Sequence, residues 1–330
     1  MAEFLTFDTD LTAVANAIRV KGGTSAQLIY PSGFVSAIQA IQTGITPKLV
    51  VTTTPGAAIT ATPAEGFKVV KGTAGADGMC TLELPKAGTW HVTAMANSVS
   101  NSQHIVIGTQ NMLLPLYHDT FANNTWEEII TVCRTGIAPD SWAVGDSKTM
   151  NIGGTAYQVD IIGKNHDEYA DGSGTAPLTF QLHDCYSEAK QMYSTNLSGL
   201  GWKNTDMRLT YLPAILALMP AEVKNGIHAV NKKTSEGGNS TTIEIVSDTL
   251  FLLSEVEIFG TASSSVAGEG SQYDYYKAGN PKIKKREGVD EFWWERSSAS
   301  GGMFGRVRAN GQAGASNASN SLGVSFAFCF

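Results

Sequence analysis

The clearest alternation of apolar and polar positions lies at the carboxyl end of the chain. It has the period of a strand with one buried face and places four apolar residues two apart: Val324, Phe326, Phe328 and Phe330. Upstream, Trp293 and Trp294 form a second apolar anchor. The runs between these anchors, 298–302 and 309–320, are mostly Ser, Gly, Ala and Asn, which favour turns and bury little apolar area. The pattern predicts a rigid scaffold that presents a loop-rich recognition surface.

The first 45 residues predict a small helical segment. Apolar residues recur there at the spacing of one helix face: Leu11, Val14, Ala15 and Ile18. Asp10 suits the N-cap, and Gly22 and Gly23 suit the end of this helix. A second helix is expected after Pro31-Ser32-Gly33. Two short helices bury little surface alone, so we expect residues 1–45 to serve attachment or oligomerisation.

Residues 46–110 predict an all-β module. Short runs of strand-forming residues alternate with turn signals such as Ala76-Asp77-Gly78. The expected strands cover 49–54, 59–62, 80–84, 89–94 and 105–107. This spacing favours a small β-sandwich acting as a spacer, with ligand binding as the alternative.

Residues 111–330 predict a larger α+β domain, because its helices and strands are segregated along the chain. A helix is expected around 126–130 and a hairpin over 147–160, turning at Gly153-Gly154. Further strands are expected over 178–182, 242–246 and 249–253. An apolar helix over 211–218 is expected to be interrupted by Pro213, and a flexible loop is expected over 263–270.

Composition limits the classes of function. Charged residues make up 16% of the chain, below the usual ~25%, and the net charge of −7 argues against a general nucleic-acid binder. No apolar stretch of about 18 residues is present, so no membrane insertion is expected. The first ten residues lack the basic region of a secretion signal. The four cysteines form no C-x-x-C pair, so free buried thiols are favoured over a disulfide and no zinc site is expected.

Candidate chemical motifs are weak. Three histidines precede an aspartate, at His118, His166 and His183, but no G-x-S-x-G or H-E-x-x-H motif accompanies them. A structural role is therefore favoured over catalysis. The acidic residues Asp167, Glu168 and Asp171 do not match the spacing of a twelve-residue calcium loop, and a solvated turn is favoured. We predict no catalytic residue, metal or cofactor.

Two further clusters leave alternatives open. The basic run Lys282, Lys284, Lys285 and Arg286 is either a solvated loop or a contact for anionic glycans or phosphate. The tyrosines at 273, 275 and 276 either border a binding site, where tyrosine buries area at low entropy cost, or pack against the Trp293-Trp294 strand.

Several segments resemble known families. Residues 11–38, with Lys21-Gly22-Gly23-Thr24 and Pro31-Ser32-Gly33-Phe34, resemble a module at the start of many phage and prophage tail-associated proteins. Residues 46–110 resemble the immunoglobulin-like or transthyretin-like modules that decorate tail proteins. Five segments together resemble a prophage-associated family that looks C-type-lectin-like in fold: 161–167, 178–182, 201–208, 249–257 and 293–297.

The region of about 294–330 is similar to the variable proteins of diversity-generating retroelements, whose lectin-like domain ends in a region diversified mostly at Asn codons. The resemblance implies a fixed scaffold at Trp293, Trp294, Phe326 and Phe328. It implies a diversified ligand-binding face at Ser298, Ser300, Gly301, Gly302, Phe304, Arg308, Ala309, Ala313 and Gly314. Each of these can arise from an Asn codon by changes in its first two bases, whereas Met303 and Gln312 cannot. Phe304 and Arg308 are the expected energetic anchors.

The resemblance implies a receptor-binding protein, or adhesin, of a phage tail. Such a protein is made in the bacterial cytoplasm, sits in the virion and binds a bacterial cell-surface receptor, either protein or glycan. It contacts other tail proteins and forms a homo-oligomer, with a trimer expected by analogy with tail fibres. One alternative is a structural virion decoration protein without a receptor role. Another is a formylglycine-generating-type enzyme, which shares the lectin-like fold but needs a reactive cysteine pair.

Overall fold

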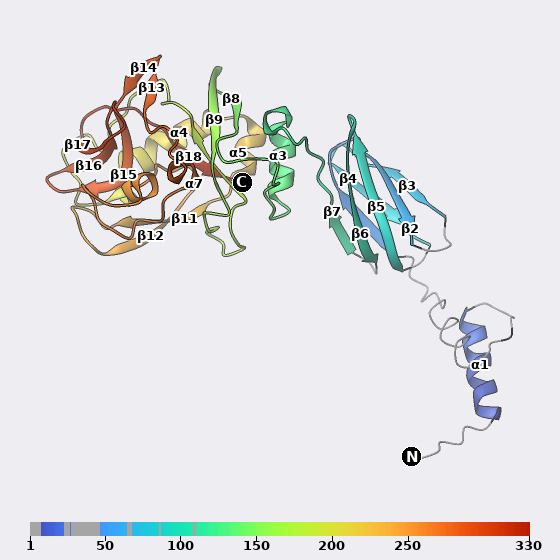
Figure 1. Ribbon diagram of the computed structural model, residues 1–330. Coiled ribbons are helices and arrows are strands. Elements are labelled where there is room, and N and C mark those ends of the chain that lie inside the picture. Colours follow the sequence, from blue (N-terminus) through green and yellow to red (C-terminus); the bar gives the residue numbers. More distant parts are fainter. Residues whose placement is uncertain (1–7, 23–26, 28–46, 65–67, 86, 108–109) are drawn as a thin grey trace. The chain divides into compact units, whose positions relative to one another are not determined.

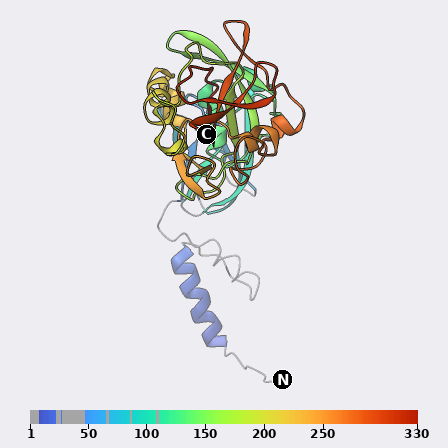
Figure 2. The same cartoon turned by 90° about the vertical axis from the view of Figure 1, so that its left-hand side faces the viewer.

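The computed structural model describes residues 8–22, 27, 47–64, 68–85, 87–107 and 110–330, and the chain divides into two compact units (Figures 1 and 2). The first unit is Met1–Leu116 and the C-terminal unit is Tyr117–Phe330. The boundary predicted after residue 110 lies too early, because strand β7 (Gln110–Leu113) pairs with β1 (Lys48–Thr52) of the first unit. Within the described ranges, no helix is both long and apolar enough to cross a membrane.

The N-terminal helix α1 spans Asp8–Gly22. It begins before Asp10, so the predicted N-cap at that residue is wrong. Ala15 and Ile18 are buried as the apolar stripe predicts, whereas Val14 is 49% exposed. The helix predicted after Pro31-Ser32-Gly33 lies outside the described residues.

The described residues of the first unit from Pro47 onward are all-β, as predicted. Two sheets enclose one apolar core that includes Leu49, Trp90 and Val92. One sheet has the order β4 (Met79–Glu83), β1, β7, and the other has the order β3 (Val70–Thr73), β2 (Ala58–Pro63), β5 (Gly88–Ala96), β6 (Val99–Ile107). Strand β4 alternates between buried and exposed positions as its sequence predicts.

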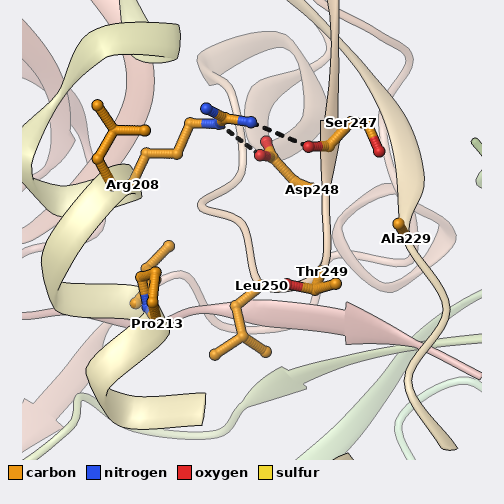
Figure 3. Close-up of a pocket in the computed structure, with 9 residues that line it drawn as sticks. Arg208, Pro213, Ala229, Ser247, Asp248, Thr249 and Leu250 are labelled. Atoms are coloured by element: carbon orange, nitrogen blue, oxygen red, sulfur yellow. Dashed lines mark hydrogen bonds and ion pairs between the residues drawn. The ribbon is translucent and has the colours of Figure 1, made fainter. Parts of the chain in front are cut away.

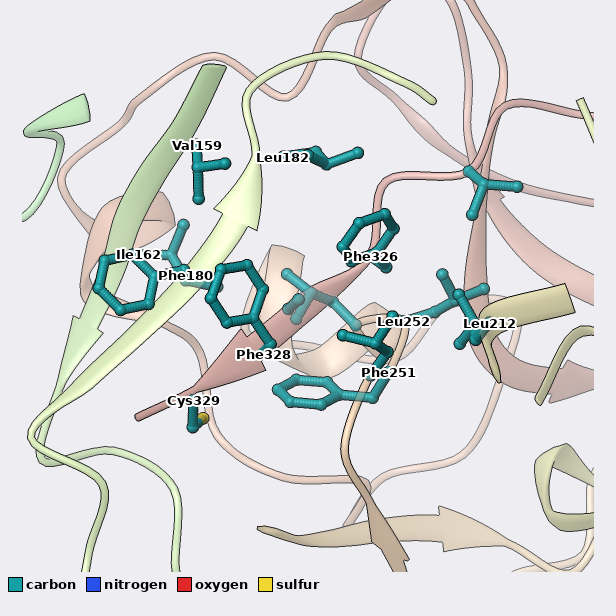
Figure 4. Packing of buried hydrophobic residues seen from close by; sticks show 14 of the residues in the cluster. Val159, Ile162, Phe180, Leu182, Leu212, Phe251, Leu252, Phe326, Phe328 and Cys329 are labelled. Atoms are coloured by element: carbon teal, nitrogen blue, oxygen red, sulfur yellow. The ribbon is translucent and has the colours of Figure 1, made fainter. Parts of the chain in front are cut away.

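The C-terminal unit is mixed α+β, as predicted. Its central antiparallel sheet has the order β18 (Ala327–Cys329), β10 (Leu178–Leu182), β9 (Thr155–Lys164), β8 (Ser147–Ile152). Helix α3 (Trp126–Cys133) begins at Thr125, whose side chain and Glu128 form a capping box. Phe180 and Phe328 stack at 5.3 Å between ring centroids in the core of this unit (Figure 4).

Three smaller sheets and several short helices complete the unit. The sheets are β11 (Val230–Ser235) with β12 (Ile243–Asp248), β13 (Lys284–Arg286) with β14 (Val289–Glu291), and β15–β16–β17, described below. The helices include α5 (Ala221–Gly226), α6 (Glu255–Phe259) and α7 (Asp274–Lys277). Helix α4 (Leu212–Leu218) follows a π-helical segment, Met207–Tyr211, and carries Pro213 in its first turn. Pro213 therefore lies in the first turn of α4 and does not interrupt the α-helix, while the helical backbone just before it is π-helical.

The end of the chain differs from its predicted pattern. Ser325, Ala327 and Cys329 are as fully buried as the phenylalanines between them. One flank of β18 is covered by the segment 249–253, which bonds to Ala327 through both backbone groups of Phe251, at 2.7 and 3.0 Å. That segment was predicted to be a strand, but it makes this single bridge. The terminal strand thus has no solvent face.

The burial of Ala327 is testable. We expect Ala327→Leu to lower the free energy of unfolding of the C-terminal unit by about 1–3 kcal/mol, because the added atoms overpack a closed core. Guanidinium unfolding followed by tryptophan fluorescence measures the change, since every tryptophan except Trp90 lies in this unit. Ala221→Leu, at an exposed position of α5, is the matched control, and an equal response of both variants would contradict the closed core.

Candidate functional site

The region singled out by sequence folds as a three-stranded antiparallel sheet (Figure 1). Its strands are β15 (Trp293–Ala299), β16 (Met303–Val307) and β17 (Ala313–Asn317), in that order. Two connections join them, residues 300–302, called the first turn here, and residues 308–312, called the second turn.

The predicted scaffold residues form a rigid base for this sheet. Trp293, Trp294, Phe326 and Phe328 are completely buried, as residues of a fixed scaffold must be. Each indole also has its polar group satisfied, because Trp293 Nε1 donates to the Lys282 carbonyl at 2.9 Å and Trp294 Nε1 donates to the Lys190 carbonyl at 2.7 Å. Large rings with fixed hydrogen bonds hold β15 in one position.

The nine predicted ligand-binding residues do not share one surface. Six are exposed or half-buried in the two turns or beside them: Ser300, Gly301, Gly302, Arg308, Ala309 and Ala313. The other three are buried: Ser298, Phe304 and Gly314. Phe304 has no exposed surface and lies against Tyr193, with 6.1 Å between ring centroids. The prediction that Phe304 is an energetic anchor for a ligand is therefore wrong, because its side chain belongs to the core.

The exposed residues fall into two groups instead of one patch. The two turns lie at opposite ends of β16, which has five residues. At about 3.3 Å per residue the groups are roughly 15 Å apart. The expected single open face with Ser300, Arg308 and Ala313 is therefore wrong. These residues lie on two separate surfaces.

The first turn is constrained by its neighbours. Gly301 and Gly302 both have positive φ, 66° and 76°, and Ala318 N donates to the Gly302 carbonyl at 3.0 Å. A Cβ atom on Gly302 would lie 2.5 Å from the Asn196 carbonyl oxygen. Gly302 is therefore required by the fold, while Ser300 is the freely exposed side chain of this turn.

The second turn is closed by its own backbone. Arg308 N donates to the Gln312 carbonyl, and Gly311 N donates to the Arg308 carbonyl, both at 2.7 Å. Asn310 and Gln312 are exposed at its tip. The sequence prediction omitted both, although the Asn-Gly pair at 310–311 is a strong turn signal.

A buried ionic network supports the sheet from within. The register of β15 shifts between Trp294 and Ser298, and Arg296 in this bulge is fully buried. Its guanidinium binds both carboxylate oxygens of Glu257 in α6. It also donates to three backbone carbonyls, those of Lys233, Leu252 and Glu269, at 2.9–3.0 Å.

Lys232 in β11 extends the network. Its ammonium lies 2.6 Å from Asp167 Oδ1, 2.8 Å from Glu257 Oε1 and 3.0 Å from the Tyr273 hydroxyl. Burial alone would raise the pKa of Asp167, but the Lys232 ammonium holds it at about 2. Burial alone would lower the pKa of Lys232, but Asp167 and Glu257 raise it. The network thus stays charged at neutral pH.

Burial separates the three acidic residues of the calcium alternative. Asp167 is buried against Lys232, whereas Glu168 and Asp171 are exposed. Within the part of the chain that the structure describes, no group of His, Cys, Asp and Glu side chains is arranged to hold a metal ion.

The histidines contact other parts of the fold. His183 Nδ1 pairs with Asp160 at 2.7 Å, not with the adjacent Asp184, and the hydrogen bond to Asp160 raises the pKa of His183. His166 stacks on Tyr273 at 4.0 Å. The backbone of His118 bonds to Asn124 and to Trp142. These contacts support the structural roles favoured from sequence.

The basic run and the tyrosines separate into different roles. Lys284 is buried and donates to the carbonyls of Leu182 and His183, and Arg286 pairs with Glu291 at 2.8 Å. Lys285 is exposed and Lys282 is half-buried. The three tyrosines are buried in the core cluster that also holds Trp293 and Trp294, which matches the packing alternative.

Two pockets of about 270 Å³ each lie elsewhere in the C-terminal unit. In one, Arg208 binds Asp248 and the Ser247 carbonyl on one side, and Pro213 and Leu250 line the other (Figure 3). The second lies over Asp167, Lys232 and Glu257. Among the described residues, none of the buried polar side-chain atoms without a hydrogen-bond partner belongs to a residue lining either pocket. The buried charged groups of both pockets, Asp248, Asp167, Lys232 and Glu257, are paired within the fold.

Comparison with known proteins gives one match. Residues 179–330, just under half of the chain, match a family described as a domain of unknown function, DUF6273. The match begins in β10 and includes the ionic network's Lys232, Glu257 and Arg296 and all of β15–β17. No curated protein and no solved structure matches the chain.

The ionic network predicts a large effect of one substitution. We expect Arg296→Met to lower the free energy of unfolding by about 3–5 kcal/mol, because Glu257 loses its bidentate partner inside the protein. The matched control is Arg308→Met at an exposed position, expected within about 0.5 kcal/mol of the native chain. Guanidinium unfolding provides both values, and a loss in Arg296→Met no larger than in the control would contradict the role of the network.

Asp167 predicts a pH dependence. Its pKa is depressed from 3.8 to about 2 in the folded chain. The ionised carboxylate therefore stabilises the folded chain at pH values above the unfolded pKa. That contribution is lost as pH falls toward about 2. We expect Asp167→Asn to be less stable than the native chain at pH 7 and to approach it at pH 2. Unfolding free energies measured from pH 2 to 7 check this, and a constant difference at all pH values would refute it.

Proposed function

We propose that this chain is a receptor-binding protein of a phage tail, and that its C-terminal unit presents the first and second turns to a receptor on a bacterial surface. One observation carries this proposal. Within residues 293–330 the aromatic side chains are sealed in the core, while the first and second turns expose small and polar side chains and are fixed by backbone hydrogen bonds. Substitution at an exposed turn position such as Ser300 costs little stability, which suits a surface that changes its ligand.

The remaining parts take supporting roles in this proposal. The C-terminal unit is a C-type-lectin-like domain whose turns are diversified by a retroelement. The all-β part of the first unit is an immunoglobulin-like spacer. Residues 1–45 attach the chain to other tail proteins or to sibling subunits in a trimer. The sequence resemblances support each assignment, and the two compact units fit a modular adhesin.

The formylglycine-generating-type alternative is disfavoured by the cysteines. All four are free and buried, as expected from sequence. Burial raises the pKa of Cys329 well above its usual value, and its sulfur lies 3.4 Å from Thr179 Oγ1 inside the core. A sealed thiol that resists ionisation is a poor nucleophile or metal ligand.

The receptor role can be measured with the fluorescently labelled chain and a panel of bacterial strains. For a strain that binds, we expect Ser300→Trp and Arg308→Ala each to weaken binding about tenfold or more, because both alter exposed side chains of the turns. Thr241→Trp, at an exposed position between β11 and β12, is the matched control and should bind as the native chain does. Unchanged binding of both turn variants would show that the receptor contacts another surface. Absence of binding across the panel would favour a structural virion protein.

A further inference from the structure

Two arginines beside the second turn lack a counter-ion. Arg306 lies in β16, and Arg308 is the first residue of the second turn. Among the described residues, no carboxylate lies within salt-bridge distance of either. Burial and the charge of Arg308 lower the pKa of Arg306. Adjacent like charges without compensation are unusual in a chain of net charge −7.

The neighbouring strand makes room for this pair. Gly314 in β17 lies directly opposite Arg306 in the sheet register. A Cβ atom on Gly314 would lie 2.8 Å from Arg308 Nε. Because Gly314 has no side chain, the Arg308 guanidinium can lie over β17. It lies there next to Gly314, the residue that faces Arg306 in the sheet. Gly314 is buried for this reason, although the sequence predicted it on the ligand-binding face.

Each guanidinium is oriented by a single contact. Arg308 Nε donates to the Ala313 carbonyl at 3.1 Å, and Arg306 Cζ lies 4.3 Å from the centroid of the Phe292 ring. The terminal nitrogens of both residues make no hydrogen bond to the described residues, and the buried Arg306 Nε also has no partner. Several oriented N–H donors thus remain free at one end of the sheet.

Lys282 lies beside the second turn through its backbone and Cβ, while its ammonium lies over two aromatic rings. Gly311 packs against the chain at Lys282 and Ile283, where an added Cβ would lie 3.8 and 3.3 Å from the nearest atoms. The Lys282 ammonium lies 5.7 Å from the ring centroids of Phe259 and Tyr276 and, within the described residues, is not paired with a carboxylate. Arg306 and Arg308, whose charge acts on Arg306, are together called the cationic cluster here.

We infer that the cationic cluster binds the anionic groups, phosphate or carboxylate, of a bacterial surface glycan. This inference rests on the proposed function, which supplies the bacterial surface that carries the glycan. Guanidinium groups bind both anions through paired N–H donors in a planar fork, which makes these contacts stronger than neutral hydrogen bonds. The rest of the chain is acidic. A local group of cations therefore determines which part of the surface faces a polyanion.

Binding of the full chain to inorganic polyphosphate and to polygalacturonate, with dextran as the neutral polymer, tests the inference. We expect the native chain to bind at least one polyanion and not dextran, and binding to weaken as salt rises. Arg306→Gln/Arg308→Gln should reduce the affinity about tenfold or more. The control Arg134→Gln/Lys224→Gln removes the same charge at exposed positions of the same unit and should change it less than twofold. Equal losses in the two double variants, or no polyanion binding by the native chain, would overturn the inference.

Gly314→Ala keeps both charges but places a Cβ against Arg308, and it tests position separately from charge. We expect a severalfold loss of polyanion affinity with an unchanged unfolding midpoint, and native affinity in this variant would show that the position of Arg308 is unimportant. The polymer that binds more tightly identifies phosphate or carboxylate as the preferred group.

Cell binding separates this inference from the proposed function. If Arg306→Gln/Arg308→Gln binds cells as well as the native chain does, and added polyanion does not reduce that binding, the receptor role stands. The cationic cluster then does not bind the ligand assigned to it. A chain that binds polyanions but no cells has the anion site without the receptor role.

Discussion

The bidentate contact between Arg296 and Glu257 is the interaction on which the C-terminal unit depends. It joins the bulge of β15 to α6, and the same guanidinium reaches the carbonyl of Lys233 in β11. Burying charges costs free energy unless each is paired and hydrogen-bonded, and Lys232 and Asp167 complete that pairing. The network fixes the strand that leads into the first turn, so the exposed side chain of Ser300 need not contribute to the fold.

Local patterns predicted much of the architecture. The all-β module, α3, the hairpin at Gly153-Gly154 and the buried scaffold tryptophans were all expected, because periodicity, turn residues and capping residues lie close together in sequence. The ionic network was not expected, since Asp167 and Arg296 are far apart in sequence and neither belongs to a recognisable motif. The apolar run 249–253 predicts a strand by its sequence, because a short buried segment has no period that distinguishes a strand from other buried structure.

The site was predicted only in part, and the reason is side-chain direction. The candidate residues were chosen by codon and residue type, which say nothing about the face of a strand. Phe304 and Arg306 share a side of β16, yet Phe304 meets Tyr193 in the core while Arg306 meets Phe292 near the edge. The small size of a residue does not predict its exposure either. Gly302 is half-buried and Gly314 is buried because neighbouring atoms occupy the space that a side chain would need.

The placement of the two turns at opposite ends of β16 limits what can touch both. A compact ligand shorter than roughly 15 Å cannot reach both, so simultaneous engagement requires an extended polymer or a folded partner surface. A ligand held by one turn would also be kept near the other at high effective concentration. Two weak contacts, one at each end of β16, would then act together as one stronger attachment. Each turn could also change its ligand preference without altering that of the other.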